Sequence, residues 1–268
     1  MPLSIMSEHR SSLLSHKRPF TDKFGTSLRK RWYGRKRQPG SKNVTRCRYF
    51  GTDFIVNLDD EVGYEIALNR FEWRELTLML DACARFTPEV FVDVGANLGL
   101  YSCVLGRHKA VPRIVAFEPD HANFARLRAN IDLNKLADKV ELHEAGAAAK
   151  AGTNTLLPAG AANRGVSRIE PAANDASGEG AYSIPIVALD DVLRVDGTNI
   201  AVKIDVEGYE LEVLMGAAQL FIHNGGFAQI KAHGDQVAGV ITELMATFGW
   251  RFVERYGLDL RFEKARGV

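Results

Sequence analysis

The pattern of apolar and polar positions predicts strands that alternate with helices along most of the chain. Short apolar runs, typical of buried strands, lie at residues 91–94, 113–117, 139–143, 200–208 and 227–233. All but the third are followed by apolar residues at helical spacing, and residues 250–265 predict two strands around a turn. This order predicts an α/β fold: a seven-stranded, mostly parallel sheet with an antiparallel C-terminal hairpin and helices on both faces.

Three further segments complete the predicted domain. Residues 49–58 alternate apolar and polar positions, which indicates an edge strand. Leu76, Met79, Leu80 and Cys83 are spaced as one face of an amphipathic helix. Residues 153–188 interrupt the alternation and predict an inserted β segment with a mobile loop near residues 172–180. We therefore expect a single domain over residues 49–268.

The first 48 residues differ sharply from the rest in charge. They carry 13 Lys and Arg against two acidic residues, whereas the remainder carries 21 basic and 31 acidic residues. The stretch 28–37 interleaves Trp32 and Tyr33 with basic residues and lacks helical periodicity, which predicts a flexible or loosely docked arm. A solvated tail is one interpretation; contact with phosphates, an anionic membrane or an acidic glycan is another. The segment also weakly resembles an organelle transit peptide.

Composition narrows the class of protein. Hydrophobic residues make up 46% and charged residues 25% of the 268 positions, which is ordinary for a globular domain. Three cysteines without ligand spacing predict free thiols in a reducing compartment and no metal site, and we expect a cytoplasmic protein. No apolar run is long enough to predict a transmembrane helix.

The segment FVDVGANLGLYS, residues 91–102, is the most informative motif. A strand that turns sharply into a helix needs glycine at the bend, here Gly95 and Gly99. A dinucleotide motif starting at Gly95 would need glycine at positions 97 and 100, which are Asn97 and Leu100. Asp93 would repel a phosphate, so the segment favours a nucleoside that carries an amino acid. An ordinary turn with two structural glycines is the alternative.

Glu118 supports the same interpretation. It ends the strand 113–117 and lies 25 positions after Asp93. In doubly wound folds, an acid at the end of the second strand accepts hydrogen bonds from ribose hydroxyls. A carboxylate suits this role because it accepts two donors at once. The alternative is a solvated carboxylate at a strand end.

Charged residues interrupt two later strands that should be apolar. Lys203, Asp205 and Glu207 share one face of the strand 200–208, and Lys231 and His233 share a face of the next. Ligands bind beyond the carboxyl ends of such strands, where Asp205 or His233 could accept the proton of an acceptor hydroxyl and Lys203 could tune the carboxylate. The alternative is a buried salt-bridge cluster that only positions the strands.

The motifs FVDVGANLGLYS, VAFEPD, LDDVL and VKIDVEGYELEVLMGA together resemble the FkbM family of S-adenosylmethionine-dependent methyltransferases, over residues 70–250. The resemblance implies a class I methyltransferase fold and O-methylation of a sugar, glycan, lipid-linked or polyketide-like hydroxyl. It implies that Glu118 and Pro119 bind the ribose and that Asp205 lies at the reacting methyl group. Other positions implied by the resemblance contact the methionine part (Asp93, Gly95, Ala96, Asn97, Gly99), flank the adenine (Gly146, Ala147) or lie near the acceptor (Asn163, Gly165, Ser167).

One departure from the family pattern concerns the predicted fifth strand. The family places an acid two residues before the histidine, where this chain has Lys231, which could pair with Asp205 or Glu207. A non-catalytic cofactor-binding protein is therefore one alternative function. A nucleic-acid methyltransferase that grips its substrate through the basic arm is a less favoured one, and a dehydrogenase is a distant one. The acceptor and the oligomeric state are not specified by these patterns.

Overall fold

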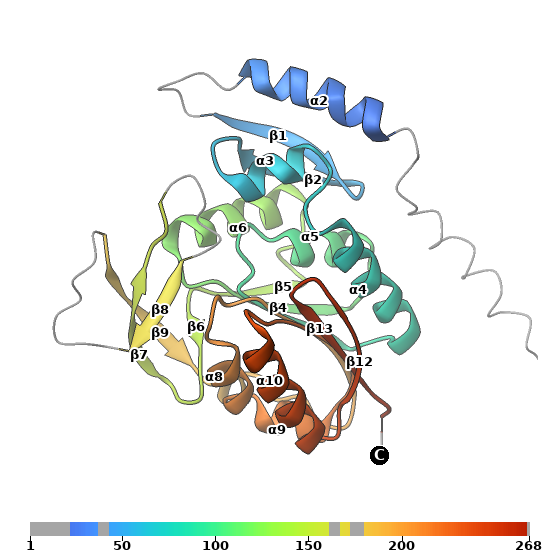
Figure 1. The fold of residues 1–268 in the computed structure, drawn as a ribbon, viewed down its shortest axis with the longest axis vertical. Coiled ribbons are helices and arrows are strands. Elements are labelled where there is room, and N and C mark those ends of the chain that lie inside the picture. The colour runs from blue at the N-terminus through green and yellow to red at the C-terminus, as the bar shows by residue number, and fades with distance from the viewer. Residues whose placement is uncertain (1–21, 37–42, 161–166, 172–179, 267–268) are drawn as a thin grey trace, which may run out of the picture.

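The central element of the fold is a seven-stranded sheet (Figure 1). The computed structural model describes residues 22–36, 43–160, 167–171 and 180–266. The strand order is β12-β13-β11-β10-β3-β4-β5, and only β13 runs against the other six. The strands are β3 (Val90–Val94), β4 (Arg113–Phe117), β5 (Val140–His143), β10 (Asn199–Ile204), β11 (Gly225–Lys231), β12 (Arg251–Tyr256) and β13 (Asp259–Lys264). The predicted fold class is confirmed.

Two hydrophobic cores cover the two faces of this sheet, because successive side chains of each buried strand point to opposite faces. Phe91 and Phe227 face the first core, whereas Val92 and Val202 face the second. The first is covered by helices α3 (Glu61–Ala67), α4 (Trp73–Phe86), α5 (Leu100–Arg107) and α6 (His121–Leu133). The second is covered by α7 (Leu189–Val192), α8 (Glu210–Met215), α9 (Ala218–His223) and α10 (Asp235–Thr247).

The predicted amphipathic helix is α4, whose four apolar positions named above are all buried. Cys47, Cys83 and Cys103 are free, buried thiols. The helix α6 begins at an N-cap, Asp120, whose carboxylate accepts hydrogen bonds from the backbone N–H groups of Ala122 and Asn123 at 2.9 and 3.0 Å. This cap starts α6 directly after the end of β4.

The N-terminal region differs from the expectation. Residues 49–58 are not one edge strand: β1 (Val44–Tyr49) and β2 (Thr52–Asn57) form a separate antiparallel hairpin that turns at Phe50–Gly51. The hairpin is held against α6 by Asn130, whose Oδ1 accepts from the Ile55 backbone at 2.7 Å. The body therefore begins before the expected boundary near residue 48.

The basic arm is not wholly irregular. Residues Asp22–Lys36 form the helix α2, which lies beside the hairpin (Figure 1). Of its described side chains only Tyr33 is buried, so the helix has no hydrophobic stripe that a periodicity test would detect. The prediction of an arm without helix is wrong for this segment, because tertiary contact through Tyr33 replaces the missing periodicity.

The expected β insertion is a second, four-stranded sheet with the order β6-β9-β7-β8. Its strands are β6 (Gly146–Ala147), β7 (Gly152–Leu157), β8 (Arg168–Pro171) and β9 (Tyr182–Val187). The loop expected near residues 172–180 lies almost entirely outside the described residues.

Two strands end earlier than their sequence patterns predicted. β10 ends at Ile204 and β11 at Lys231, so Asp205, Glu207 and His233 lie in the loops that follow and are not strand residues. The backbone of Glu207 has a φ of 48°, a left-handed conformation that interrupts the alternation of faces. Among the described helices, none has the length and apolar character needed to cross a membrane.

Candidate active site

A cavity of about 280 Å³ lies at the carboxyl ends of β3, β4, β5 and β10. Most of the predicted cofactor and catalytic residues line it: Asp93, Gly95, Ala96, Asn97, Glu118, Pro119, Gly146, Ala147, Lys203, Asp205 and Glu207. Ser167 also lines the cavity, whereas Asn163 and Gly165 lie outside the described residues. Gly99 and His233 are not among the lining residues.

The turn after β3 depends on its glycines. Gly95 and Gly99 have φ values of 82° and 88°, which residues with a side chain rarely adopt. A Cβ atom on Gly95 would lie 1.9 Å from the backbone oxygen of Asp205, closer than any real contact. The backbone N–H groups of Gly95 and Ala96 both donate to the Phe117 oxygen at 3.0 Å. The turn is therefore locked between two neighbouring strand ends.

Asp93 anchors the same turn from inside. Its buried carboxylate accepts a hydrogen bond from the Ser102 hydroxyl at 2.6 Å and one from the Ser102 backbone at 3.2 Å. Burial raises its pKa to about 6, although both hydrogen bonds and Lys203 favour the charged form. Asp93 thus holds the first turn of α5, in addition to lining the cavity.

Glu118, in the segment VAFEPD, is hydrogen-bonded to the glycine turn of the segment FVDVGANLGLYS. One carboxylate oxygen accepts from the Asn97 backbone at 2.7 Å and the other from the Asp120 backbone at 2.9 Å. Burial raises its pKa to about 7, against the effect of these hydrogen bonds. The Asn123 side chain also donates to this carboxylate, which leaves one acceptor site for a ligand hydroxyl.

Three features of this half of the cavity fit S-adenosylmethionine. Gly95, Ala96 and Asn97 of the turn line the cavity, where a ligand can contact them directly. The side-chain oxygen of Asn97 is buried and has no hydrogen-bond partner among the described residues, although its residue lines the cavity. Gly146 lies where a Cβ atom would come within 2.7 Å of Ile169 and Ile186, which keeps that wall flat. The residues can therefore hold an amino acid group, a ribose and a base.

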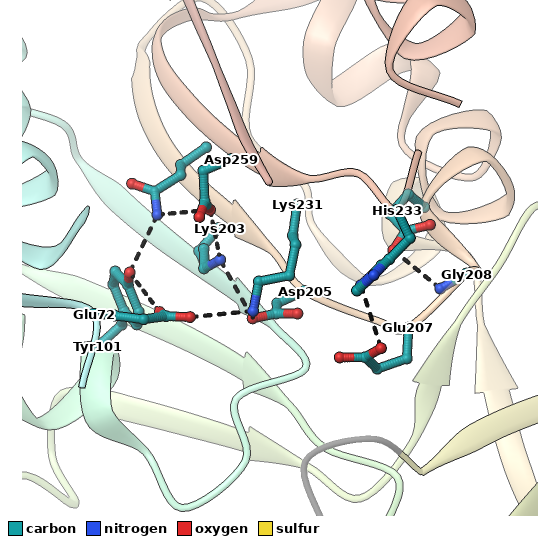
Figure 2. A network of polar contacts seen from close by, with 11 residues as sticks. Glu72, Tyr101, Lys203, Asp205, Glu207, Gly208, Lys231, His233 and Asp259 are labelled. Carbon is teal, nitrogen blue, oxygen red and sulfur yellow. Dashed lines mark hydrogen bonds and ion pairs between the residues drawn. The ribbon is translucent and has the colours of Figure 1, made fainter. Parts of the chain in front are cut away.

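The other half of the cavity holds a network of ionised side chains (Figure 2). Lys203 of β10 contacts Asp259 at 3.1 Å and Asp205 at 3.4 Å. Lys231 of β11 contacts the same carboxylate oxygen of Asp205, Oδ2, and contacts Glu72 at 3.1 Å. The Asp205 carboxylate thus lies between two ammonium groups.

These contacts determine the protonation states. Burial disfavours a charge on Asp205, but Lys203 and Lys231 outweigh burial and lower its pKa. Burial likewise opposes the charges of the two lysines, and the surrounding carboxylates outweigh burial and raise both pKa values. Asp205 stays ionised and paired, which makes it a weak proton acceptor.

Glu207 and His233 form a separate pair at 3.2 Å. Burial and the nearby Asp205 charge raise the pKa of Glu207, which also lines the cavity. His233 contacts Glu207 without lining the cavity itself, so the expected convergence of all four catalytic candidates is only partly observed.

Four residues of the network were not predicted from the sequence. Glu72 lies at the N-cap of α4 with a φ of 43°, and its carboxylate accepts from the Tyr101 hydroxyl at 2.9 Å. The buried Gln229 donates to the Tyr101 hydroxyl at 3.1 Å and to Asp259 at 3.0 Å. Glu72 and Asp259 come from segments far apart in the chain, and no local motif marks them, whereas Tyr101 lies in the motif 91–102 without a predicted role.

Comparison with known proteins gives consistent matches. The family model "Methyltransferase FkbM domain" matches residues 93–249. The hexuronic acid methyltransferase AglP of Haloferax volcanii is 29% identical over 209 residues, which cover 77% of this chain and 80% of that protein. The methyltransferase sdnD of Sordaria araneosa is 28% identical over 206 residues, covering 65% of this chain and 75% of the other. A solved FkbM methyltransferase from Methylobacillus flagellatus is 20% identical, with a TM-score of 0.46, and the match covers 65% of this chain and 43% of that one.

The sheet order and the cavity beyond its strand ends define a class I methyltransferase fold. Because the family model covers more than half of the sequence, the chain belongs to the FkbM methyltransferase family. The protein is an S-adenosylmethionine-dependent methyltransferase.

Proposed function

We propose that this enzyme is an O-methyltransferase whose acceptor is a hydroxyl of a sugar, glycan, lipid-linked or polyketide-like molecule. The observation that carries the proposal is the Glu207–His233 pair beside the paired, ionised Asp205. A hydroxyl needs a proton acceptor as it attacks a methyl group, and Glu207 supplies a carboxylate whose pKa is raised. The relatives support the acceptor class by name, since AglP is a hexuronic acid methyltransferase.

The cofactor contacts form the second part of the proposal. Asp93, Gly95, Ala96, Asn97 and Gly99 hold or shape the site of the methionine part. Glu118 and Pro119 hold the ribose, while Gly146 and Ala147 flank the adenine. When bound, S-adenosylmethionine supplies an electrophilic methyl group. Asp205, whose carboxylate is held by Lys203 and Lys231, would line the site of the reacting methyl group.

The chain's own residues then handle the acceptor proton. With cofactor and acceptor bound, a carboxylate oxygen of Glu207 would take the proton of the acceptor hydroxyl as the methyl group passes from the cofactor sulfur to the acceptor oxygen. His233, in contact with that carboxylate, orients it. Much of the rate enhancement comes from aligning the acceptor with the methyl group.

The first experiment is calorimetric titration with S-adenosylhomocysteine, with NAD as the control ligand. We expect saturable binding of the former alone, and loss of that binding in Glu118→Ala. Unchanged binding by Glu118→Ala would contradict the ribose assignment.

The second experiment addresses the proton acceptor. Transfer of a labelled methyl group to a panel of saccharides and polyketides identifies an acceptor, and Glu207→Gln is expected to lower kcat by about 100-fold or more. Glu212→Gln, on the helix that follows Glu207 but outside the cavity lining, is the matched control. Cofactor binding without transfer to any acceptor would favour the non-catalytic alternative.

A nucleic-acid acceptor is a second candidate, because α2 exposes Lys30, Arg31 and Arg35. A gel-shift assay with a salt titration tests it: phosphate contacts give affinity that falls steeply with salt. Absence of binding at low salt would remove this candidate. A surface contact through the basic arm and a cytoplasmic location also stay predictions.

A further inference from the structure

A second, open groove of about 490 Å³ adjoins the cofactor cavity. It is lined by the segment that leads into α4 and by Tyr256 at the end of β12. Phe71 and Glu72 line both the groove and the cavity, so they form the wall between them. A molecule bound in the groove would therefore lie next to the residues around the methyl donor.

Glu72 is held firmly at this junction. Its carboxylate accepts from Lys231 at 3.1 Å and from the Tyr101 hydroxyl at 2.9 Å. Its left-handed backbone is an uncommon conformation for glutamate, of the kind that persists at functional sites when neighbouring contacts enforce it. Lys231, which stands where the family pattern has an acid, therefore forms ion pairs with both Asp205 and Glu72.

Arg74 differs from Arg70, the other cation of the groove, while Glu75 lines the same groove without an ion pair to a described residue. Arg70 pairs with Glu65, and Glu72 pairs with Lys231. The Arg74 guanidinium lies 4.0 Å from the centre of the Tyr256 ring, and within the described part of the chain it makes no ion pair. Stacking on a ring orients a guanidinium but leaves its N–H donors free at the edge. Arg74 is thus an exposed, oriented cation in the groove.

We propose that this groove receives the acidic end of an acceptor that extends past Glu72 into the cavity, where its reacting hydroxyl lies near Glu207. Arg74 binds the carboxylate, which makes the acceptor an acidic saccharide such as a uronic acid. A planar guanidinium binds a carboxylate through two parallel hydrogen bonds. Trp73, half-buried in the same groove, offers an apolar surface to the C–H face of a sugar ring. The inference rests on the proposed O-methyltransferase function and specifies its substrate.

The test uses the full chain saturated with S-adenosylhomocysteine and compares two probes, methyl β-D-glucuronide and methyl β-D-glucoside. They differ only in the group at C6, a carboxylate or a hydroxymethyl. Titrations followed by saturation-transfer NMR are expected to show tighter binding of the glucuronide. Arg74→Gln should weaken glucuronide binding about tenfold or more and leave glucoside binding nearly unchanged.

Arg85→Gln is the matched control. Arg85 lies on the same helix and over an aromatic ring, at 5.0 Å from Phe86, but it pairs with Glu263 and lies outside the groove. This variant should keep the preference for the glucuronide. Arg74→Lys keeps the charge without the planar fork and should give an intermediate affinity.

Equal binding of the two probes, or a preference that survives Arg74→Gln, would overturn the inference. Calorimetry with S-adenosylhomocysteine on the same samples tests the cofactor site separately from the acidic acceptor. Cofactor binding without acidic preference refutes the acidic acceptor alone. Absence of cofactor binding refutes the cofactor placement and, with it, the inference that rests on it.

Discussion

The two halves of the active-site cavity are built differently. The cofactor half, where we propose that the cofactor binds, is made by one turn, residues 93–99, and by Glu118 at the next strand end, and backbone groups supply most of its contacts. The acceptor half is made by charged side chains from α4, β10, β11 and β13, which neutralise one another. The first half therefore depends on backbone conformation and the second on charge balance.

This difference explains why the halves tolerate change differently. A backbone site is disrupted by any side chain added at the turn, whatever its charge. A charge network is disrupted when one partner leaves an ion buried without compensation. The following substitutions probe each half, from the largest expected effect to the smallest.

The largest effect is expected for Gly95→Ala in the cofactor half. The added Cβ would strain a φ of 82° and overlap the Asp205 backbone oxygen. We expect a loss of about 5 kcal/mol in the free energy of unfolding and no detectable S-adenosylhomocysteine binding. Urea unfolding and calorimetry measure both.

Gly51→Ala is the control for Gly95→Ala. Gly51 has a similar φ of 70° but no atom within 4 Å of an added Cβ. It should cost about 1 kcal/mol, from backbone strain alone. Equal losses for the two variants would show that crowding at Gly95 is unimportant.

Lys203→Met is the corresponding test in the acceptor half. The buried Asp259 would lose its ammonium partner, and we expect about 3 kcal/mol of destabilisation in urea unfolding. Arg46→Ala, which breaks an exposed pair with Asp53, should cost less than about 1 kcal/mol. A Lys203→Met protein as stable as the parent would mean that the network is not needed for folding.

Glu118→Gln combines a binding and a pH test. We expect about tenfold weaker S-adenosylhomocysteine binding, because the amide accepts fewer ribose hydrogen bonds than the carboxylate. In the parent, affinity should rise with pH and level off above about 7, because deprotonation creates the acceptor carboxylate and the pKa of Glu118 is raised to about 7. In Glu118→Gln this rise should disappear. Asp93, with a pKa of about 6, is present in both proteins and accounts for any dependence shared by them.

Lys231→Met should have the smallest effect on stability. Asp205 would keep Lys203 and Glu72 would keep Tyr101, so about 1 kcal/mol is expected. The pKa of Asp205 would rise because one of its two cations is lost. A loss as large as that of Lys203→Met would show that the two lysines are energetically equivalent.

Much of the fold followed from periodicity. The seven strands of the main sheet, the inserted β sheet and the helix α4 all lie close to their predicted positions. The predictions of secondary structure were wrong where contacts between distant segments, and not the local pattern of apolar residues, determine the element. The helix α2 has no stripe of apolar residues, residues 49–58 turn back at Gly51, and β10 and β11 stop before their charged residues.

The site was predictable to the extent that its residues form local motifs. The glycine turn and Glu118 are marked by spacing, because a βα unit places its turn and the next strand end side by side. Lys203, Asp205 and Glu207 were noticed as charges in an apolar strand. Glu72 lies 133 positions from Asp205 and Asp259 lies 54 positions from it, and neither carries such a mark.

The sequence by itself determined the α/β alternation, the family and the residues of the cofactor turn, because these depend on contacts between neighbours in the chain. Only the tertiary structure decided which carboxylate lies between two ammonium groups and which lies beside a histidine. Two lysines from adjacent strands hold Asp205, while Glu207 turns away through a left-handed backbone toward His233. Electrostatic interactions depend on distance in space, and folding, not sequence separation, sets that distance.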